Sequence, residues 1–414
     1  MAKVNKILML VENVSVPLDS RVWPEARSLH DVGYQVCVIC PKGIGREEES
    51  YICLEGIYIY RYQLPVIGGR YISYITEYCY SLLMTFFLSL KVFFKHGFDV
   101  IHAANPPDTF FLIGLFYRFL GKKYIFDQHD LASELFKVKF KGRMKLLYKF
   151  QLFLEMSSYR TANLVITSNK SQKKRAIERG GCDAGKVFVV RNGPNSKQME
   201  LAPPEPELKK GRRYLLAYVG FMSSQDGIEY ALHSLQYLVY KRQRQDISLV
   251  LMGDGDSAPK LRKLAHELAL EEYVNFTGWI EKEDVLRYLS AADVGLTPDP
   301  QNGLNEYSTM LKTMEYMAMG KPVVSFDLQE AHFSTQDAAL YAIPNQVEDF
   351  AEKIETLLDN HELRREMGAI GRKRIEQELS WEHSKENLLI AYETIFSAKS
   401  KASVSSDSSV LIRS

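Results

Sequence analysis

Cysteine is scarce in this chain, which has only five among 414 residues, an odd number. Without a recognisable signal peptide, an odd cysteine count indicates a reducing compartment rather than a secreted disulfide scaffold. Cys37 and Cys40 have the C-x-x-C spacing, but they lie in the apolar run 36–40, which is typical of a buried strand. An offset of three residues along a strand puts two side chains on opposite faces, so we interpret both as core thiols rather than as a zinc or redox pair.

An uninterrupted apolar run of membrane-spanning length is also absent, since such a span needs roughly 18–20 residues. The first run, residues 7–11, is short and ends at Glu12, which suits a strand better than a signal peptide. The longest run, residues 82–94, is interrupted by Lys91. We expect it to form a buried helix or a segment that lies on a membrane, and we do not expect a transmembrane crossing.

Net charge is small overall, at +1, but the two halves of the chain differ in sign. Residues 1–200 hold 28 Lys and Arg against 18 Asp and Glu, a net charge of +10, whereas residues 201–414 hold 24 against 33, a net charge of −9. A basic half indicates an interaction surface and favours a membrane face or a phosphorylated acceptor. The sequence has no RNA- or DNA-binding motif, so no nucleic-acid partner is expected.

Short apolar runs alternate with longer amphipathic stretches along most of the chain. Strands are predicted at residues 7–11, 36–40, 57–62, 100–102, 124–127, 164–167 and 187–190, and again at 215–219, 247–252, 273–276, 294–296, 323–326 and 339–342. Alternation of this kind predicts an α/β fold with parallel, doubly wound sheets. Between the two series, residues 201–207 contain three prolines, which is typical of a linker.

We therefore predict two tandem Rossmann-like domains, with a single large sheet as the alternative. The first domain is expected at residues 1–200 and the second at 206–375, followed by a helix at 376–396. The serine-rich tail, residues 397–414, is expected to be disordered. Ligands of such domains bind outside the carboxyl ends of the strands.

Two segments have a spacing that suits a phosphate-bearing ligand. Gly253-x-Gly255-x-x-Ala258 fits the dinucleotide pattern G-x-G-x-x-A loosely, but it follows the second strand of its domain and has acids inside the loop. A dinucleotide site is therefore disfavoured. The other segment, residues 305–324, is a polar loop that leads into a Met-rich helix, which stops at Gly320.

The start of this second helix could bind an anion. Ser308 or Thr309 is a candidate N-cap, and a helix N-terminus that follows a loop attracts anions. Lys312 adds a positive charge for a diphosphate, and Glu315 lies three residues further on nearly the same face. A carboxylate there can accept hydrogen bonds from both ribose hydroxyls of a nucleotide. Spacing alone favours the alternative, a surface Lys–Glu pair on an ordinary helix.

Residues 312–324, Lys312-x-x-Glu315-Tyr-Met-Ala-x-Gly320-x-Pro322-Val-Val, resemble the donor-binding segment of glycosyltransferase family 4, a retaining family with the GT-B fold. Other segments are similar, in the same order, to the family's histidine segment, the loop that closes the first domain, the start of the second domain and two later loops. These segments are Phe126-Asp127-Gln128-His129-Asp130-Leu131, Arg191-Asn192-Gly193, Tyr218-Val219-Gly220, Phe276-x-Gly278 and Ala291-Ala292-Asp293-Val294. The resemblance covers nearly all of residues 5–395.

This resemblance implies a role for each domain and for several residues. The first domain would bind the acceptor, the second would bind a nucleotide-sugar donor, and the helix after Trp381 would cross back to the first domain. His129 would contact the transferred sugar or its leaving group, Glu315 the donor's ribose, and Lys312 its diphosphate. Backbone N–H groups near Gly220 and Ser308 would also bind the phosphates. The catalytic residues so implied are His129 and Glu315, and no metal or other cofactor is implied.

The chain departs from the family pattern at two places. Eight positions before Glu315, where many members have a first glutamate, stands Tyr307, with Glu306 one position away. Residues 221–227, after Gly220, lack the basic pair that many members carry. The segment around His129 lacks the D-x-D of metal-dependent transferases, in line with the metal independence that the resemblance implies. Taken alone, His129 is better explained as a capping or core histidine, and its place in the family's segment reverses that preference.

Four lysines recur at every fourth position beside an apolar stripe. The lysines are Lys137, Lys141, Lys145 and Lys149, and the stripe is Phe136, Phe140, Met144 and Leu147. This pattern predicts an amphipathic helix with a basic edge, which Gly142 weakens, and a solvated lysine face is the alternative. Because this half of the chain is basic, we expect attachment to an anionic membrane surface, where each Lys or Arg contributes on the order of 1 kcal/mol.

The sequence thus predicts a retaining hexosyltransferase that moves a sugar from a nucleotide-sugar donor to a glycan or lipid-linked acceptor in cell-surface polysaccharide or glycoconjugate biosynthesis. The expected location is the cytoplasm, peripheral on the inner face of the cell membrane. The alternatives are a nucleotide-sugar epimerase of the GT-B fold and a non-catalytic GT-B scaffold.

Overall fold

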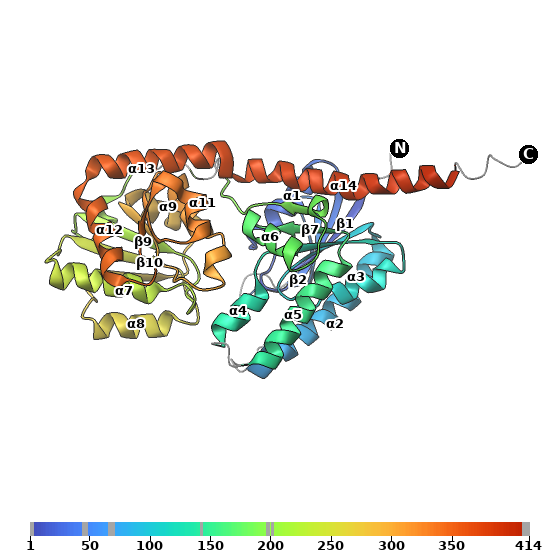
Figure 1. Ribbon diagram of the computed structural model, residues 1–414, viewed down its shortest axis with the longest axis horizontal. Helices are drawn as coiled ribbons and strands as arrows, with labels where there is room; N and C mark the ends of the chain where they lie inside the picture. Colours follow the sequence, from blue (N-terminus) through green and yellow to red (C-terminus); the bar gives the residue numbers. More distant parts are fainter. Residues whose placement is uncertain are drawn as a thin grey trace, which may run out of the picture. The chain divides into compact units, whose positions relative to one another are not determined.

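The computed structural model describes residues 4–43, 49–64, 71–140, 144–195, 199 and 203–407, with the backbone alone at 71–75 and 398–407. The chain divides into two compact units. Unit 1 comprises Met1–Arg191 together with Ser384–Ser414, and unit 2 comprises Asn192–His383. Each unit is a largely parallel β-sheet covered by helices (Figure 1), so the predicted fold class of two Rossmann-like α/β domains is confirmed.

Unit 1 is built around an eight-stranded sheet with the order β3-β4-β2-β1-β5-β6-β7-β8. Its strands are β1 (Lys6–Leu10), β2 (Gln35–Pro41), β3 (Tyr51–Leu54), β4 (Ile57–Tyr62), β5 (Val100–Ala104), β6 (Lys123–Gln128), β7 (Leu164–Thr167) and β8 (Val187–Val189). Its helices are α1 (Val22–Asp31), α2 (Tyr71–Lys95), α3 (Phe111–Arg118), α4 (Ala132–Lys139), α5 (Lys145–Thr161), α6 (Lys170–Glu178) and most of α14 (Trp381–Asp407). The inner strands are almost wholly buried runs of apolar residues, as expected for parallel strands covered on both faces.

Unit 2 contains a six-stranded parallel sheet with the order β11-β10-β9-β12-β13-β14. Its strands are β9 (Tyr214–Val219), β10 (Ile247–Met252), β11 (Val274–Gly278), β12 (Val294–Thr297), β13 (Val323–Phe326) and β14 (Ala339–Ala342). Its helices are α7 (Ile228–Gln236), α8 (Ala258–Glu267), α9 (Lys282–Ala291), α10 (Leu311–Ala318), α11 (Gln329–Thr335), α12 (Val347–Asp359) and α13 (His361–Arg374).

Every predicted strand is present within two residues at each end, but β3 was not predicted. This short edge strand pairs antiparallel with β4 through the turn Glu55–Gly56. Both turn residues have positive φ, 47° and 81°, as a two-residue hairpin turn requires. The strand has only four residues, which is too few for a periodic pattern to stand out in the sequence.

The boundary between the units lies earlier than predicted. We placed a linker near residues 201–207, whereas the chain leaves unit 1 between Arg191 and Asn192. The later part of the proline-rich stretch belongs to unit 2, because Glu205 pairs with Arg287 at 2.6 Å and Lys209 with Asp293 at 2.7 Å. These ion pairs hold it against α9 and the start of β12.

The chain returns to unit 1 after His383. In α14, Leu388, Ala391 and Tyr392 are fully buried, and the Lys123 ammonium donates to the Ile395 carbonyl oxygen. The predicted disorder of residues 397–414 is corrected in part, since α14 continues to Asp407 and residues 408–414 lie outside the described residues. Residues 397–407 contain neither proline nor glycine, so no residue ends the helix there.

The predicted basic amphipathic helix is not continuous. α4 ends at Lys139 and α5 begins at Lys145, while residues 141–143, Lys141 and Gly142 among them, lie outside the described residues. The two helices pack against each other, and the predicted apolar stripe lines a pocket of about 190 Å³ between them. Its lining residues are Phe136, Lys137, Phe140, Met144, Lys145 and Tyr148. Glycine is a poor helix former, which explains why the lysine spacing failed to specify one helix.

Helix α2 contains the longest apolar run. Its segment Thr76–Lys95, 20 residues, is long and apolar enough to cross a membrane by length and composition. One such helix is weak evidence, because a core helix passes the same test. Ser81, Thr85, Ser89 and Val92 of α2 are fully buried, so one face of this helix packs against the protein.

Candidate active site

The strand order reverses between β1 and β5 in unit 1 and between β9 and β12 in unit 2. Loops at the carboxyl ends of strands beside such a reversal diverge and leave room for a ligand. The sequence-predicted site residues of each unit lie in or near these loops. Each unit is described separately below.

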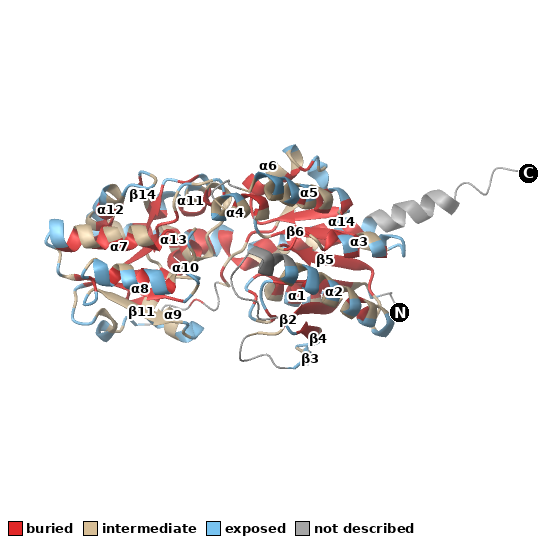
Figure 2. Cartoon of the chain, turned by 90° about the horizontal axis from the view of Figure 1, so that it is seen from below, coloured by how far each residue is buried: buried red, intermediate tan, exposed pale blue. Residues whose placement is uncertain are grey.

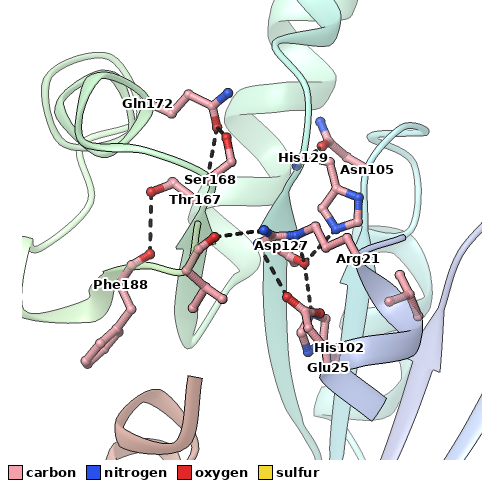
Figure 3. Close-up of polar contacts among 12 residues, drawn as sticks. Arg21, Glu25, His102, Asn105, Asp127, His129, Thr167, Ser168, Gln172 and Phe188 are labelled. Carbon is pink, nitrogen blue, oxygen red and sulfur yellow. Dashed lines mark hydrogen bonds and ion pairs between the residues drawn. The ribbon is translucent and has the colours of Figure 1, made fainter. Parts of the chain in front are cut away.

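His129 lies directly after β6 and is held by the neighbouring loop (Figure 3). Its Nε2 lies 2.6 Å from Oδ2 of Asp127, and its backbone N–H donates to Oδ1 of Asn105 at 2.7 Å. Asn105 follows β5 and also accepts the backbone N–H of Asp130, at 3.1 Å. The His129 side chain is 15% exposed. Because Asp127 engages Nε2, Nδ1 is the ring nitrogen that remains for a substrate.

Asp127 is the centre of a buried polar cluster beneath His129 (Figure 3). Its carboxylate accepts two hydrogen bonds from the Arg21 guanidinium, at 2.6 and 3.1 Å. The Nε2 of His102, from β5, lies 3.2 Å from the same carboxylate. Glu25, one turn after Arg21, lies 3.4 Å from the guanidinium and 3.5 Å from His102. The fold thus brings α1, β5 and β6 together around one carboxylate.

The four groups of this cluster carry different charges. Burial alone would raise the pKa of the Asp127 carboxyl, but Arg21 and the two histidines hold it well below its usual value. Burial raises the pKa of the Glu25 carboxyl, and the charge of Asp127 raises it further. Burial lowers the pKa of His102. The cluster therefore contains one ion pair, Arg21–Asp127, beside a carboxyl and an imidazole, those of Glu25 and His102, whose charged forms are disfavoured by burial.

Glu25, His102 and Asp127 place potential ligand atoms within 4.8 Å of one another, as a metal site would. The Arg21 guanidinium already lies among these atoms and supplies the positive charge that two carboxyls require. The side chains of Arg21, Glu25 and Asp127 are at most 3% exposed. We interpret the group as an internal ion cluster that positions His129.

The cluster also contacts the last helix of the chain. The hydroxyl of Tyr392, in α14, lies 2.7 Å from Nδ1 of His102. Since Nε2 of His102 faces the ionised Asp127, that nitrogen carries the proton, and Nδ1 accepts from Tyr392. A chain of polar contacts therefore runs from α14 through His102 and Asp127 to His129.

In unit 2, Gly220 ends β9 and is packed tightly against the loop after β10. Its φ is +141°, and a Cβ on the adjacent Gly253 would lie 2.0 Å from the Gly220 carbonyl oxygen. A Cβ on Gly255 would lie 2.6 Å from the Met222 carbonyl oxygen. Gly253 and Gly255, the glycines of the loose dinucleotide pattern, thus allow two backbones to approach closely. This packing accounts for both glycines, so a dinucleotide site is not needed to explain them.

Ser308 does not cap α10. Its hydroxyl donates to the Leu304 carbonyl oxygen at 2.9 Å, and the helix begins at Leu311 with Met310 as the N-cap residue. The predicted Ser308 or Thr309 cap is therefore wrong, because a short 3₁₀ turn, Asn305–Tyr307, ends at Ser308 and delays the helix. The side chain of Met310 makes no capping hydrogen bond to the first turn of α10.

Lys312 lies in the first turn of α10 and faces the end of β12. Its Nζ donates to Oδ1 of Asp299 at 2.9 Å and lies 4.0 Å from Asp226. Burial opposes the charge of Lys312, but Asp299, Tyr218 and Asp226 together raise its pKa. Burial raises the pKa of Asp299 to about 6. The bond to Asp299 uses one of the three N–H donors of the ammonium, and the Tyr218 ring also lies 4.9 Å from it.

Glu315 lies one turn further along α10 and is half-buried. Its carboxylate has no hydrogen-bond partner among the described residues, and burial raises its pKa to about 7. Lys312 and Glu315 are therefore both partly desolvated, in contrast to the exposed Lys–Glu pair that was the alternative. Glu306 is engaged elsewhere through one oxygen, since its Oε1 accepts the backbone N–H of Gln329 at 3.3 Å.

Sequence reasoning missed Arg21, Glu25, His102, Asp299 and Tyr392. Arg21 and Glu25 form an i,i+4 pair of opposite charges, which normally indicates an exposed helix face. A histidine inside the apolar run of β5, and an aspartate directly after β12, were the available signals. None of these signals reveals that the side chains meet.

Two family models match the chain. Residues 21–198 match the model described as Glycosyltransferase Family 4, and residues 213–360 match Glycosyl transferases group 1. A curated relative, an uncharacterized glycosyltransferase of Methanocaldococcus jannaschii, is 22% identical over 86% of this chain and 88% of its own length. The alpha-D-kanosaminyltransferase of Streptomyces kanamyceticus is 27% identical, but over 37% of this chain and 39% of its own length.

Solved structures show the same fold. The sucrose-phosphate synthase of Thermosynechococcus elongatus superposes with a TM-score of 0.77 at 19% identity, over 95% of this chain and 100% of the synthase chain. WaaG, a glycosyltransferase involved in lipopolysaccharide biosynthesis, has a TM-score of 0.70 at 15% identity, over 93% and 99% of the two chains. An Anabaena protein in complex with UDP-glucose has a TM-score of 0.69 at 16% identity, over 94% and 99%.

Proposed function

Because the chain is a glycosyltransferase of the GT-B fold, with family 4 and group 1 segments in its two units, we propose that it transfers a sugar with retention of configuration. The donor is a nucleotide sugar, and the acceptor is a glycan or lipid-linked molecule of cell-surface polysaccharide or glycoconjugate biosynthesis. In this reaction the bond from the anomeric carbon to the diphosphate breaks, and the diphosphate leaves with the electron pair. The acceptor hydroxyl oxygen bonds to that carbon on the same face and gives its proton to the departing diphosphate oxygen.

The observation that carries this proposal is the placement of Lys312 and Glu315 in α10. Both lie beside the strand reversal of unit 2, where backbone N–H groups at the first turn of α10 can bind an anion. Lys312 and these N–H groups, with those near Gly220, offset the charge that develops on the leaving diphosphate. The unpartnered carboxylate of Glu315 accepts hydrogen bonds from the ribose.

Unit 1 contributes His129 and the acceptor side of the reaction in this proposal. The Asp127 contact orients its ring and leaves Nδ1 to interact with the transferred sugar or its leaving group. A uridine nucleotide is supported by the neighbours solved with UDP or UDP-glucose. A relative named as GDP-mannose-dependent, from Corynebacterium glutamicum, keeps guanosine as the other candidate.

The acceptor chemistry and the basic charge of the first half place the protein, in our proposal, on the inner face of the cell membrane. A relative in Candida albicans is named as a mannosyltransferase acting on a diphosphodolichol-linked sugar, which supports a lipid-linked acceptor. This attachment is peripheral, since α2 packs one face against the sheet of unit 1.

The donor site is tested by calorimetric titration of wild type, Glu315→Gln and Lys312→Ala with uridine, UDP, guanosine and GDP. Charged hydrogen bonds contribute roughly 1.5–3 kcal/mol, so Glu315→Gln should weaken both nucleoside and diphosphate about ten- to a hundredfold. Lys312→Ala should weaken the diphosphate more than the nucleoside. Glu366→Gln, an exposed change on α13, is the matched control. Unchanged diphosphate affinity in Glu315→Gln would show that the donor site is placed wrongly.

A further inference from the structure

Three neighbouring helices of unit 1 each expose an apolar stripe. On α5 the stripe is Leu146, Phe150 and Phe153, spaced i, i+4, i+7 on one side of the helix. On α2 it is Leu83, Phe87 and Phe94. On α3 it is Leu112 and Phe116, continued by Phe119 and Leu120 directly after the helix. Phe119, Phe94 and Leu146 are 91%, 83% and 80% exposed, so the protein buries very little of them. We call these ten residues the apolar face.

The three stripes belong to one layer. The rings of Phe86 on α2 and Phe116 on α3 lie 5.1 Å apart, and the hydroxyls of Ser89 and Tyr117 are 3.0 Å apart. α3 packs against α5 as well. The opposite sides of these helices join the core through Val92, Ile113 and Tyr159, so the stripes point away from the sheet. Figures 1 and 2 show α2, α3 and α5 together, with exposed residues along them.

The exposed charges described on these three helices have one sign. They are Lys91, Lys95, Arg118, Lys145, Lys149 and Arg160. Of the two acidic residues described on these helices, Glu77 is half-buried, and Glu155 is buried and paired with Arg179 at 3.1 Å. Helices that expose aromatic side chains together with basic groups alone are unlike the mixed-charge surface of a soluble monomer.

We propose that the apolar face docks on an anionic lipid bilayer, with its phenylalanines in the headgroup–acyl boundary and the basic groups of the same helices on the lipid phosphates. Aromatic side chains at this depth with Lys and Arg beside them are the physical pattern of interfacial binding. A second copy of the chain is a poorer occupant, because it would bring two sets of basic groups together. This inference rests on the membrane attachment in the proposed function. It assigns that attachment to α2, α3 and α5 in place of the predicted lysine series from Lys137 to Lys149.

The proposal is tested by flotation of the full chain with vesicles of phosphatidylcholine alone or mixed with phosphatidylglycerol. We expect binding to the anionic vesicles that weakens with salt, and little binding to neutral ones. Phe87→Ser/Phe150→Ser should reduce binding by about tenfold or more for each lost side chain. The control is Trp279→Ser/Ile343→Ser, which removes two equally exposed apolar side chains from unit 2 and should bind like wild type.

Three results would overturn this inference: no binding to anionic vesicles, equal binding of the phenylalanine variant and wild type, or a concentration-dependent dimer that the same variant abolishes. Circular dichroism confirms that each variant is folded. Sugar transfer to a water-soluble acceptor is measured in parallel without vesicles. If transfer persists while vesicle binding is absent, the apolar face is not a membrane-docking surface and the proposed transfer stands. If transfer is absent while vesicle binding persists, the proposed transfer is wrong and the membrane docking stands.

Discussion

The Glu315 carboxyl is held in surroundings that oppose its charge. Its pKa of about 7 in the folded chain lies above the usual value of 4.5, so the folded state binds the proton more tightly than the unfolded state. Stability therefore falls as the pH rises from about 4.5 to about 7, and the loss is complete above that window. A side chain whose only role is packing would not impose this loss of folding stability.

We predict that Glu315→Gln stabilises the ligand-free protein at pH 8 by about 1 kcal/mol while weakening nucleoside binding. Urea unfolding at pH 8 and pH 4.5 measures the first effect, which should vanish at the lower pH because wild-type Glu315 is then largely protonated. Glu366→Gln should change stability equally little at both pH values. A gain of the same size at pH 4.5 would mean that the carboxylate charge is not the cause.

At the scale of elements, the interleaved loops after β9 and β10 fix the position of Gly220. Gly253 has a φ of +129° and almost no space for a side chain. We predict that Gly253→Ala costs about 3 kcal/mol or more and weakens UDP binding, since strain and a backbone clash add together. Gly211→Ala is the matched control, because Gly211 has a φ of +76° with open space around it. It should cost only about 1–2 kcal/mol, the price of the left-handed backbone.

Urea denaturation gives both stabilities, and calorimetry gives the UDP affinity. Equal costs for the two alanine variants would show that the loops separate to admit a Cβ. In that case the contact with Gly253 would not hold Gly220 in place.

The same elements show what the sequence could predict. Parallel strands such as β1 and β10 are continuous buried apolar runs, so a local pattern is enough to find them. The spacing of four lysines after residue 136 predicted one helix, but the chain forms two helices there, α4 and α5, which pack against each other. Lys312 and Glu315 were found through a family resemblance. Asp299 and Asp226, which pair with Lys312, were not found, because contacts between distant segments leave no periodic signal in the sequence.

His129 illustrates this limit in unit 1. Its place after β6 was predictable, but its orientation depends on Asp127, which in turn is held by Arg21 from a helix far away in sequence. The i,i+4 spacing of Arg21 and Glu25 is common on solvent-exposed helix faces, whereas both side chains are buried here. Whether a charged side chain is buried depends on how distant segments assemble around the sheet. A short stretch of sequence does not contain that information.

For the molecule as a whole, the charge chemistry of unit 2 bears on metal dependence. In the proposed mechanism, Lys312 and the first turn of α10 supply the positive potential that a divalent ion supplies in metal-dependent transferases. We predict that transfer activity stays within about twofold of its untreated value after incubation with EDTA. EDTA saturated with Mg²⁺ is the control for chelator effects unrelated to the metal. Abolition of turnover by EDTA and recovery with added Mg²⁺ would contradict the proposed role of Lys312.

The return of α14 to unit 1 also sets an order of events during synthesis. Residues up to Arg191 leave the ribosome first, but the buried position beside His102 stays empty until Tyr392 has been translated. Unit 2 is continuous from Asn192 to His383, so all of it is made before unit 1 has its last helix. Domains usually complete folding from the N-terminus onward. Here the second half of the chain can finish first, and the nascent first half must keep its apolar surfaces from aggregating until the final segment arrives.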